Sequence, residues 1–292
     1  MLEGAWKYYE KEYKKLLLIP LIVLLFFGGV IVYTKFSTGE FFAKDISLKG
    51  GTSITFYVDE PLTGVSEWLS DSWGEDTQLI VITNPLGGFK GYDFRVGTQL
   101  SVDEVKAQLS VLAGREVLHD EFSLGLQGAS IAQSFFNDSI IIILISFLLM
   151  GLVALYYFKS VIPAVSITFS TIADVIVVVG VLNLLGEPLS VASIGALLML
   201  IGLSTDSDML LAANIIKKKD EGLINRLKRS FKTELTMSLA AITTATVMYL
   251  LTNIEMIKSI ALILLIGSIS DVLNTWVLSA GLQRLYMEWK RK

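Results

Sequence analysis

Six long apolar stretches, each bounded by polar residues, dominate the pattern along this chain of 292 residues. A membrane-spanning helix needs about 20 predominantly apolar residues to cross the hydrocarbon core of a bilayer. The pattern therefore predicts an α-helical, polytopic membrane protein with six transmembrane helices. Their predicted ranges are 16–33, 139–158, 161–185, 189–213, 235–253 and 257–282.

Between the first two stretches lies a polar segment long enough to build a core of its own, residues 34–138. Alternating apolar and polar residues predict strands, and apolar residues at helical spacing predict helices. Ser101 and Glu104 stand at the spacing of a capping box at the start of the second helix. The order β-α-β-β-α-β is typical of an α+β, ferredoxin-like unit. The predicted strands are 52–58, 77–83, 92–96 and 116–122, and the predicted helices are 65–73 and 102–112.

Composition and charge support the membrane assignment and orient the helices. Hydrophobic residues make up 53% and charged residues 18% of the chain, and the mean hydropathy is +0.61. Basic residues gather before the first stretch, between the fourth and fifth, and after the sixth, and short loops of this kind stay cytoplasmic. With six spans, both termini lie in the cytoplasm and the ferredoxin-like domain lies outside it, in a protein of the cell membrane.

This topology divides the chain into parts with different expected roles. Residues 1–15 and 284–292 are expected to form cytoplasmic termini, and 34–138 the extracytoplasmic domain. The last five helices occupy 139–283, with a cytoplasmic amphipathic connector at 214–232. The first stretch fits an uncleaved anchor better than a cleaved signal peptide, because its apolar core is long and no small-residue cleavage pattern follows it.

Several aspartates fall inside the predicted spans, where an Asp at a helix centre costs about 2.5 to 3.5 kcal/mol. No Lys or Arg lies within a span core to neutralise them. Burial favours the neutral carboxyl group, so these side chains can hold a proton that a hydrated or partnered state would release. The sequence thus predicts ion-coupling groups. The candidates are Asp206, Asp208, Asp174 and Asp271, with Asn274 near the last of them.

Position along the helices distinguishes these aspartates. Asp206 and Asp208 are two residues apart and therefore face nearly opposite sides of one helix. We expect Asp206 to be the deeper, functional group, whereas Asp208 near the cytoplasmic interface equally fits a solvated helix end. Counting the rise per residue places Asp206 and Asp271 in the inner half of the membrane and Asp174 in the outer half. Asp174 and Asp271 equally fit hydrogen-bonded packing between helices.

Other chemistries leave little trace in the sequence. The chain has no cysteine, which excludes disulfides and thiolate metal sites, and no phosphate loop of the Walker type, so nucleotide hydrolysis is not expected. His119 is the one histidine, and we expect a structural role for it in a strand. Gly50 and Gly51 are expected to form a turn or bulge that leads into a strand. No enzymatic activity, metal, cofactor or nucleic-acid partner is predicted.

The plan of one anchor, one external ferredoxin-like domain and five closely spaced spans resembles the SecF family, the smaller partners of SecD in protein export. Short runs of residues carry the resemblance. The run 45–52, closing on Gly50-Gly51-Thr52, is similar to the family's signature after the first span. The run 201–208 is similar to its fourth-span motif Ile-Gly-Tyr-Ser-x-Asn-Asp-Thr. Further similarities are Ala173-Asp174-Val175 with a His-Asp-Val of the third span, and Ser238, Thr243 and Thr244 with a Ser/Thr-rich fifth span.

Two departures from the bacterial pattern suggest an archaeal member of the family. Asp206 falls where bacterial sequences have Asn, and where SecD-type sequences have the Asp of a Val-Asp-Ala-Asn run. Ala213 and Asn214 replace the Asp-Arg that ends the bacterial motif, which puts any role of that arginine in doubt.

The resemblance implies an accessory membrane subunit that pairs with a SecD-like subunit beside a SecYEG-type channel, within the lipid bilayer. It would promote the translocation or release of secreted polypeptides, coupled to a proton gradient through Asp206, as carboxylates of the fourth span act in the wider RND superfamily. Half of an RND-type exporter of small molecules or lipids is the alternative, although drug-efflux relatives carry larger external insertions. A non-transporting scaffold for another membrane enzyme is the third alternative.

Overall fold

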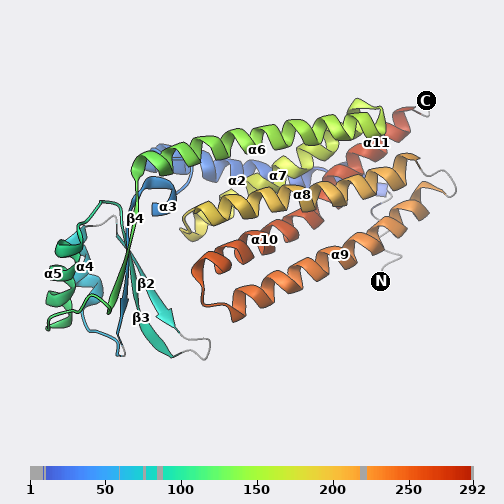
Figure 1. The fold of residues 1–292 in the computed structure, drawn as a ribbon. Helices are drawn as coiled ribbons and strands as arrows, with labels where there is room; N and C mark the ends of the chain where they lie inside the picture. Colours follow the sequence, from blue (N-terminus) through green and yellow to red (C-terminus); the bar gives the residue numbers. More distant parts are fainter. Residues whose placement is uncertain are drawn as a thin grey trace.

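Long helices lie side by side in one bundle, and a small α/β domain caps one end of it (Figure 1). The computed structural model describes residues 9, 11–58, 60–74, 77–83, 88–217 and 222–290. Parts of the predicted termini and of the predicted connector therefore lie outside the described residues. At the end of the bundle away from the domain, the Tyr13 hydroxyl donates a hydrogen bond to Glu288 over 2.6 Å, which joins the first and last helices.

Six helices among the described residues are long and apolar enough to cross a membrane, as the sequence predicts. Apolar runs of this length form helices in lipid because a helix satisfies its backbone hydrogen bonds internally. The main helical elements are α2 (Leu18–Thr38), α6 (Ala129–Phe158), α7 (Val161–Leu185), α8 (Val191–Ala212), α9 (Leu223–Leu251) and α10 (Glu255–Leu273).

Three helix ends differ from the prediction. α6 begins ten residues before position 139, because its first turns carry polar residues that an apolar pattern leaves out. The connector predicted at 214–232 is wrong as a separate element. Its start continues α8 as the π-helix η1 (Ala213–Lys217), and from Leu223 it forms the first turns of α9. The sixth span continues through a second π-helix, η2 (Asn274–Ser279), into α11 (Ala280–Lys290).

The α/β domain has the element order β-α-β-β-α-β that the sequence predicts. Its sheet has the strand order β2-β3-β1-β4, and each strand pairs antiparallel with its neighbours. Ser101 caps the second helix, and both hydrogen bonds of the predicted capping box with Glu104 are present. The elements are β1 (Gly51–Tyr57), α4 (Val65–Trp73), β2 (Thr77–Thr83), β3 (Phe89–Val96), α5 (Val102–Ala113) and β4 (Phe122–Gln127).

The last strand of the domain lies later than predicted. Residues 116–122 do not form it, because Arg115 holds the Glu121 carboxylate with two hydrogen bonds of 2.8 Å. The Leu118 backbone N–H donates to the same carboxylate over 3.0 Å. These bonds close a turn, so β4 begins at Phe122. His119 is exposed in this turn, and the prediction that it lies in a strand is wrong.

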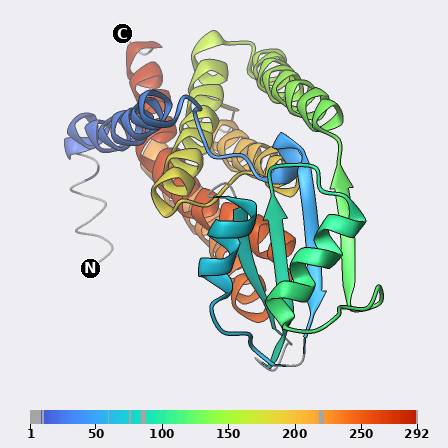
Figure 2. The same cartoon turned by 90° about the vertical axis from the view of Figure 1, so that its left-hand side faces the viewer.

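The two faces of the sheet differ in chemistry. Apolar side chains from alternate positions of β1 and β3 pack under α4 and α5, with Ile54, Phe56 and Phe94 fully buried among them. Figure 2, viewed from the domain end, shows both helices on this one side of the sheet. The positions between them, including Ser53, Asp93 and Arg95, lie on the opposite face, toward the helix bundle. The domain therefore presents a polar face to the membrane helices.

The centre of the bundle is formed by α7, α8 and α10, which are its most buried helices. Gly267 on α10 lies against Leu200 on α8 so closely that an added Cβ would come within 2.4 Å of a Leu200 methyl group. Gly180 on α7 is similarly close to Phe27 on α2. Such small residues let membrane helices approach one another. All four intramembrane aspartates lie on these helices. Asp174 is on α7 and Asp271 on α10, whereas Asp206 and Asp208 are on opposite sides of α8.

Candidate functional site

Three aspartates from the three central helices meet inside the bundle. Asp174 on α7 and Asp208 on α8 are fully buried, and Asp271 on α10 is 5% exposed. Their charges are close enough to interact, since Asp271 acts electrostatically on both Asp174 and Asp208. We refer to these three residues, together with Glu234 introduced below, as the carboxylate cluster. A group of this kind within membrane helices is a functional-site hypothesis by default.

Asp174 binds the three helices together through hydrogen bonds. The Ser204 hydroxyl on α8 donates to its Oδ2 over 2.7 Å. From α10, the Ser270 hydroxyl donates to its Oδ1 over 2.8 Å, and from η2 the Asn274 side-chain amide donates to the same oxygen over 2.7 Å. The prediction that Asp174 fits interhelical hydrogen bonding is therefore confirmed.

Asp271 has fewer hydrogen bonds. The Ser207 hydroxyl on α8 donates to its Oδ2 over 3.0 Å, and the Thr275 hydroxyl donates to its Oδ1 over 3.3 Å. Ser204 and Ser207 lie one turn of α8 apart. Ser204 thus donates to Asp174, and Ser207 donates to Asp271. Asp174 and Asp271 therefore bond to neighbouring turns of α8 and lie close enough for their charges to interact. The prediction that they lie at separate depths is wrong. These depths were counted from the predicted helix ends by the rise per residue. That estimate was wrong because α10 continues through η2 and α11 past the level at which α7 begins.

Asp208 has fewer hydrogen bonds than Asp174 and Asp271. Within the described residues, neither of its carboxyl oxygens has a partner at hydrogen-bonding distance, although both oxygens are buried. Ser170 on α7 and Ser279 at the end of η2 lie toward it. A buried polar group without a partner is costly. No described Lys or Arg forms an ion pair with any member of the cluster.

Asp206 lies outside this cluster. It is exposed on the surface of α8, whereas Asp208 is fully buried, so the prediction that the two face opposite sides of the helix is confirmed. Asp208, not Asp206, is thus the member of the pair that contacts the other helices of this chain. The expectation that Asp206 is the functional group at the greater membrane depth stays a prediction. Asp208 does not form a solvated helix end, because η1 extends the helix beyond it and the bundle closes around it.

A fourth acidic side chain, Glu234 on α9, joins the cluster and was missed by sequence reasoning. It is 1% exposed and interacts electrostatically with Asp271 and Asp208. Trp276 of η2 lies beside it. Glu234 falls one residue before the predicted fifth span, so an apolar pattern leaves it outside the membrane helices. The signal was its position four residues before Ser238, on the face that continues into the buried side of the span.

Two π-helical segments flank the cluster. η1 begins five residues after Asp208, and η2 begins at Asn274, which itself bonds Asp174. Single π-helical turns inside α-helices occur frequently at functional sites. Arg226 of α9 is 3% exposed and donates a hydrogen bond of 2.7 Å to the Ile215 carbonyl of η1. Arg226 falls within the predicted amphipathic connector, but it is buried against the carbonyls of η1.

The run Gly50-Gly51-Thr52 joins the domain to the bundle. Gly50 has φ +85°, and an added Cβ would lie 2.4 Å from the Ala129 Cα at the start of α6. Gly51 has φ +149°, with the Val96 carbonyl equally close. The buried Thr52 hydroxyl donates to the Thr98 carbonyl and accepts from the Leu100 N–H, both over 2.9 Å. The predicted turn into a strand is confirmed, and its role in this structure is packing.

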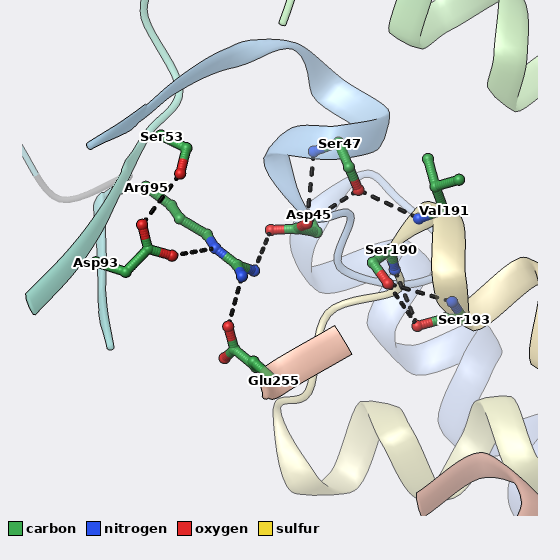
Figure 3. A network of polar contacts seen from close by, with 9 residues as sticks. All are labelled: Asp45, Ser47, Ser53, Asp93, Arg95, Ser190, Val191, Ser193 and Glu255. Carbon is green, nitrogen blue, oxygen red and sulfur yellow. Dashed lines mark hydrogen bonds and ion pairs between the residues drawn. The ribbon is translucent and has the colours of Figure 1, made fainter. Parts of the chain in front are cut away.

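A second polar group lies where the domain meets the bundle (Figure 3). Arg95 of β3 donates to Asp93 on its own strand over 3.3 Å and to Asp45 over 3.0 Å. It also donates to Glu255, the first residue of α10. Asp45 caps the short helix α3 (Ile46–Lys49), and its backbone N–H donates to the Leu189 carbonyl over 2.8 Å. Arg95 thus links the sheet to the ends of the helices that lie nearest the domain.

Arg95 stays positively charged throughout this contact. Its partial burial alone would lower the pKa of the guanidinium, but the carboxylates of Asp45, Glu255 and Asp93 more than compensate, so the pKa is raised. Three carboxylates around one cation leave a local excess of negative charge at the end of the bundle that faces the domain.

Comparisons with known proteins agree with this architecture. Residues 118–289 match the family described as "Protein export membrane protein SecD/SecF, C-terminal". The "Protein-export membrane protein SecF" of Pyrococcus furiosus is 30% identical over 95% of this chain and 92% of its own length. The protein of the same description from Methanocaldococcus jannaschii is 30% identical over 97% of this chain and 99% of its own.

Among solved structures, SecDF from Thermus thermophilus, a translocon-associated membrane protein, superposes with a TM-score of 0.74 at 17% sequence identity. The match covers 97% of this chain and 38% of that chain, so this chain corresponds to the smaller part of a SecDF polypeptide. SecDF in a super-membrane-facing form matches with a TM-score of 0.65. The resemblance predicted from the sequence is thereby confirmed: this chain belongs to the SecF family of protein-export membrane proteins, and its relatives are archaeal.

Proposed function

We propose that this chain is an accessory subunit of the Sec protein-export machinery that pairs with a SecD-like subunit. The names of its archaeal relatives support a role in protein export. The SecDF structure supports the pairing, because this chain accounts for only the smaller part of that polypeptide. A separate SecD-like chain would supply the remainder, beside a SecYEG-type channel through which secreted polypeptides pass.

The membrane face of α8 is the surface that the partner would cover. Asp206, Gly195 and Gly202 are exposed on this face, and the space beside both glycines is open. A carboxylate facing lipid is costly, which favours a protein partner on this face. In this proposal Asp206 keeps a role in ion coupling, at the contact between the two subunits.

The carboxylate cluster would carry protons during the export cycle. The observation that carries this proposal is the meeting of four buried acidic side chains from four helices, with no described cation paired to them. In this arrangement the protonated and ionised states differ in their demand for water or a partner. Movement of a proton into or out of the cluster would therefore change how α7, α8, α9 and α10 pack.

The α/β domain would lie on the outer side of the membrane as a ferredoxin-like unit, with both termini in the cytoplasm. The strand order and antiparallel pairing of the domain support the ferredoxin-like fold. The basic residues in the other short connections support the topology, with both termini in the cytoplasm and the domain outside.

Substitution within the cluster tests the export function. We expect Asp208→Asn and Asp271→Asn to reduce the export of a secreted reporter by at least roughly tenfold, a change of about 1.4 kcal/mol, because Asn cannot exchange the proton. The measurement is the rate at which the reporter's signal peptide is removed, in cells that depend on this chain. The matched control is Asp138→Asn, an exposed carboxyl on α6. Normal export by both cluster variants, at normal protein levels, would contradict the proposal.

A further inference from the structure

The junction between the domain and the bundle is polar and partly open. The domain core under α4 and α5 and the apolar cluster at the outer end of the bundle are separate. Between them lie a cavity of about 390 Å³ and a second of about 200 Å³, which share Ile80, Glu187 and Glu255 among their lining residues. Polar junctions of this kind between domains permit relative motion.

Arg95 bridges this junction through two kinds of partner. Asp93 belongs to the same strand as Arg95, and Asp45 is 6% exposed in its side chain and held by Leu189 and Ser47. These two partners are fixed. Glu255 is different, because its side chain is 39% exposed at the rim of both cavities and Arg95 is its one described ion-pair partner.

Release of Glu255 leaves no charge buried without a partner. Arg95 would keep the carboxylates of Asp45 and Asp93, and Glu255 would turn into water at the cavity rim. Exposed ion pairs contribute little to stability, whereas separating a buried pair is strongly unfavourable. The contact between Arg95 and Glu255 can therefore open and close at low cost, while the contact with Asp45 persists.

Helix α10 connects this contact to the carboxylate cluster. Glu255 begins α10, and Asp271 lies on the same unbroken α-helix, at about 24 Å by the rise per residue. The π-helix η2 follows directly after α10, at the level of the cluster. A shift of α10 caused by a change at Asp271 would move Glu255 relative to Arg95.

We propose that Arg95 is a positioning residue whose releasable ion pair with Glu255 seats the α/β domain on α10, and that the cluster controls this pair through α10. The inference rests on the proposed function of the cluster. Other charged groups face the same junction, namely Asp45, Asp93, Glu187 and Lys258. In the cluster, the groups that face Asp271 are Asp174, Asp208 and Glu234.

Distance measurements between two spin labels test the seating of the domain. The chain has no cysteine, so Val111→Cys on α5 and Tyr156→Cys on α6, at positions 71% and 85% exposed, give one defined label pair. The full-length chain is measured in lipid nanodiscs, with and without its co-purified partner. We expect Glu255→Gln to add a second distance population that the unsubstituted label pair lacks.

The matched control is Glu187→Gln, which removes the same charge from the same two cavities without touching Arg95. We expect it to leave the distances unchanged. Arg95→Gln is less informative, because it leaves Asp45 and Asp93 without a cation. A distance distribution for Glu255→Gln that equals both the unsubstituted and the Glu187→Gln distributions would overturn the proposal.

The link to the cluster has a separate test. We expect Asp271→Asn to change the distance distribution in the otherwise unsubstituted chain, but to add nothing in the Glu255→Gln background. Independent, additive changes would overturn the link. These distances are read without an export assay, so they stay decisive if the cluster variants export normally. Conversely, export lost in Asp208→Asn with distances unaffected by Glu255→Gln would retain the proposed function and reject the positioning role of Arg95.

Discussion

Single residues two positions apart on α8 have opposite environments. Asp208 is buried among the carboxylates of the other helices, whereas Asp206 is exposed on the surface of this chain. Helical periodicity predicted that the two differ, but not which of them faces inward, because α8 carries small and apolar residues on all sides. That choice depends on the neighbouring elements, since Ser170 of α7 and Ser279 of η2 lie toward Asp208.

Gly50 gives a test of close packing at the scale of one residue. We expect Gly50→Ala to destabilise the junction by about 1 to 3 kcal/mol, because the new methyl group would collide with the Ala129 backbone. Thermal unfolding of the purified protein measures this loss. Gly64→Ala is the control, since Gly64 has a similar φ of +74° but open space around it. Equal losses for both variants would show that backbone conformation, and not the collision, requires glycine at position 50.

Elements whose ends are fixed by residues close in sequence lie where they were predicted. Elements whose ends depend on other side-chain contacts do not. The second helix of the domain lies where Ser101 and Glu104 place it. The last strand begins at Phe122 because Arg115 and Glu121 close a turn before it, and alternation of residues does not reveal that ion pair. Glu234 was missed because α9 begins well before the predicted fifth span. The side chain of Glu234 lies near Asp271 and Trp276, and the sequence does not show this proximity.

The capping box of α5 gives a test at the scale of one element. We expect Ser101→Ala to destabilise α5 by about 1 kcal/mol, because the side chain of Ser101 accepts a hydrogen bond from the Glu104 N–H. Hydrogen exchange of the α5 amides in the full-length protein measures the effect. A variant whose α5 amides exchange at the rate of the unsubstituted protein would contradict it.

The same element has a defined pH dependence. The bonds from the Ser101 backbone and hydroxyl lower the pKa of Glu104 below its ordinary value of 4.5. A carboxyl whose pKa is lowered by folding stabilises the folded state above its unfolded pKa, and this contribution is lost as the pH falls through the folded pKa. Protection of the α5 amides should therefore fall on acidification below about pH 4.5, and it should fall less in Ser101→Ala.

At the scale of the whole molecule, the domain lies at one end of the helices, and the start of α9 and the end of α11 lie at the other (Figure 1). We expect a cysteine at Val111 on α5 to react with a membrane-impermeant maleimide added outside intact cells. A cysteine at Arg229 near the start of α9 should react only after the membrane is opened, because loops rich in Lys and Arg stay cytoplasmic. The reverse pattern of labelling would invert the proposed topology.

Proton movement through the complete complex tests the central claim most directly. The chain and its co-purified SecD-like subunit are reconstituted in liposomes that contain a pH-sensitive dye, and a proton gradient is imposed. We predict proton flux with the unsubstituted chain and with Asp138→Asn, and a flux at least roughly tenfold lower, about 1.4 kcal/mol, with Asp208→Asn. Equal flux in Asp208→Asn and in the unsubstituted complex, or no flux in either, would contradict the assignment of the carboxylate cluster as the proton-carrying site.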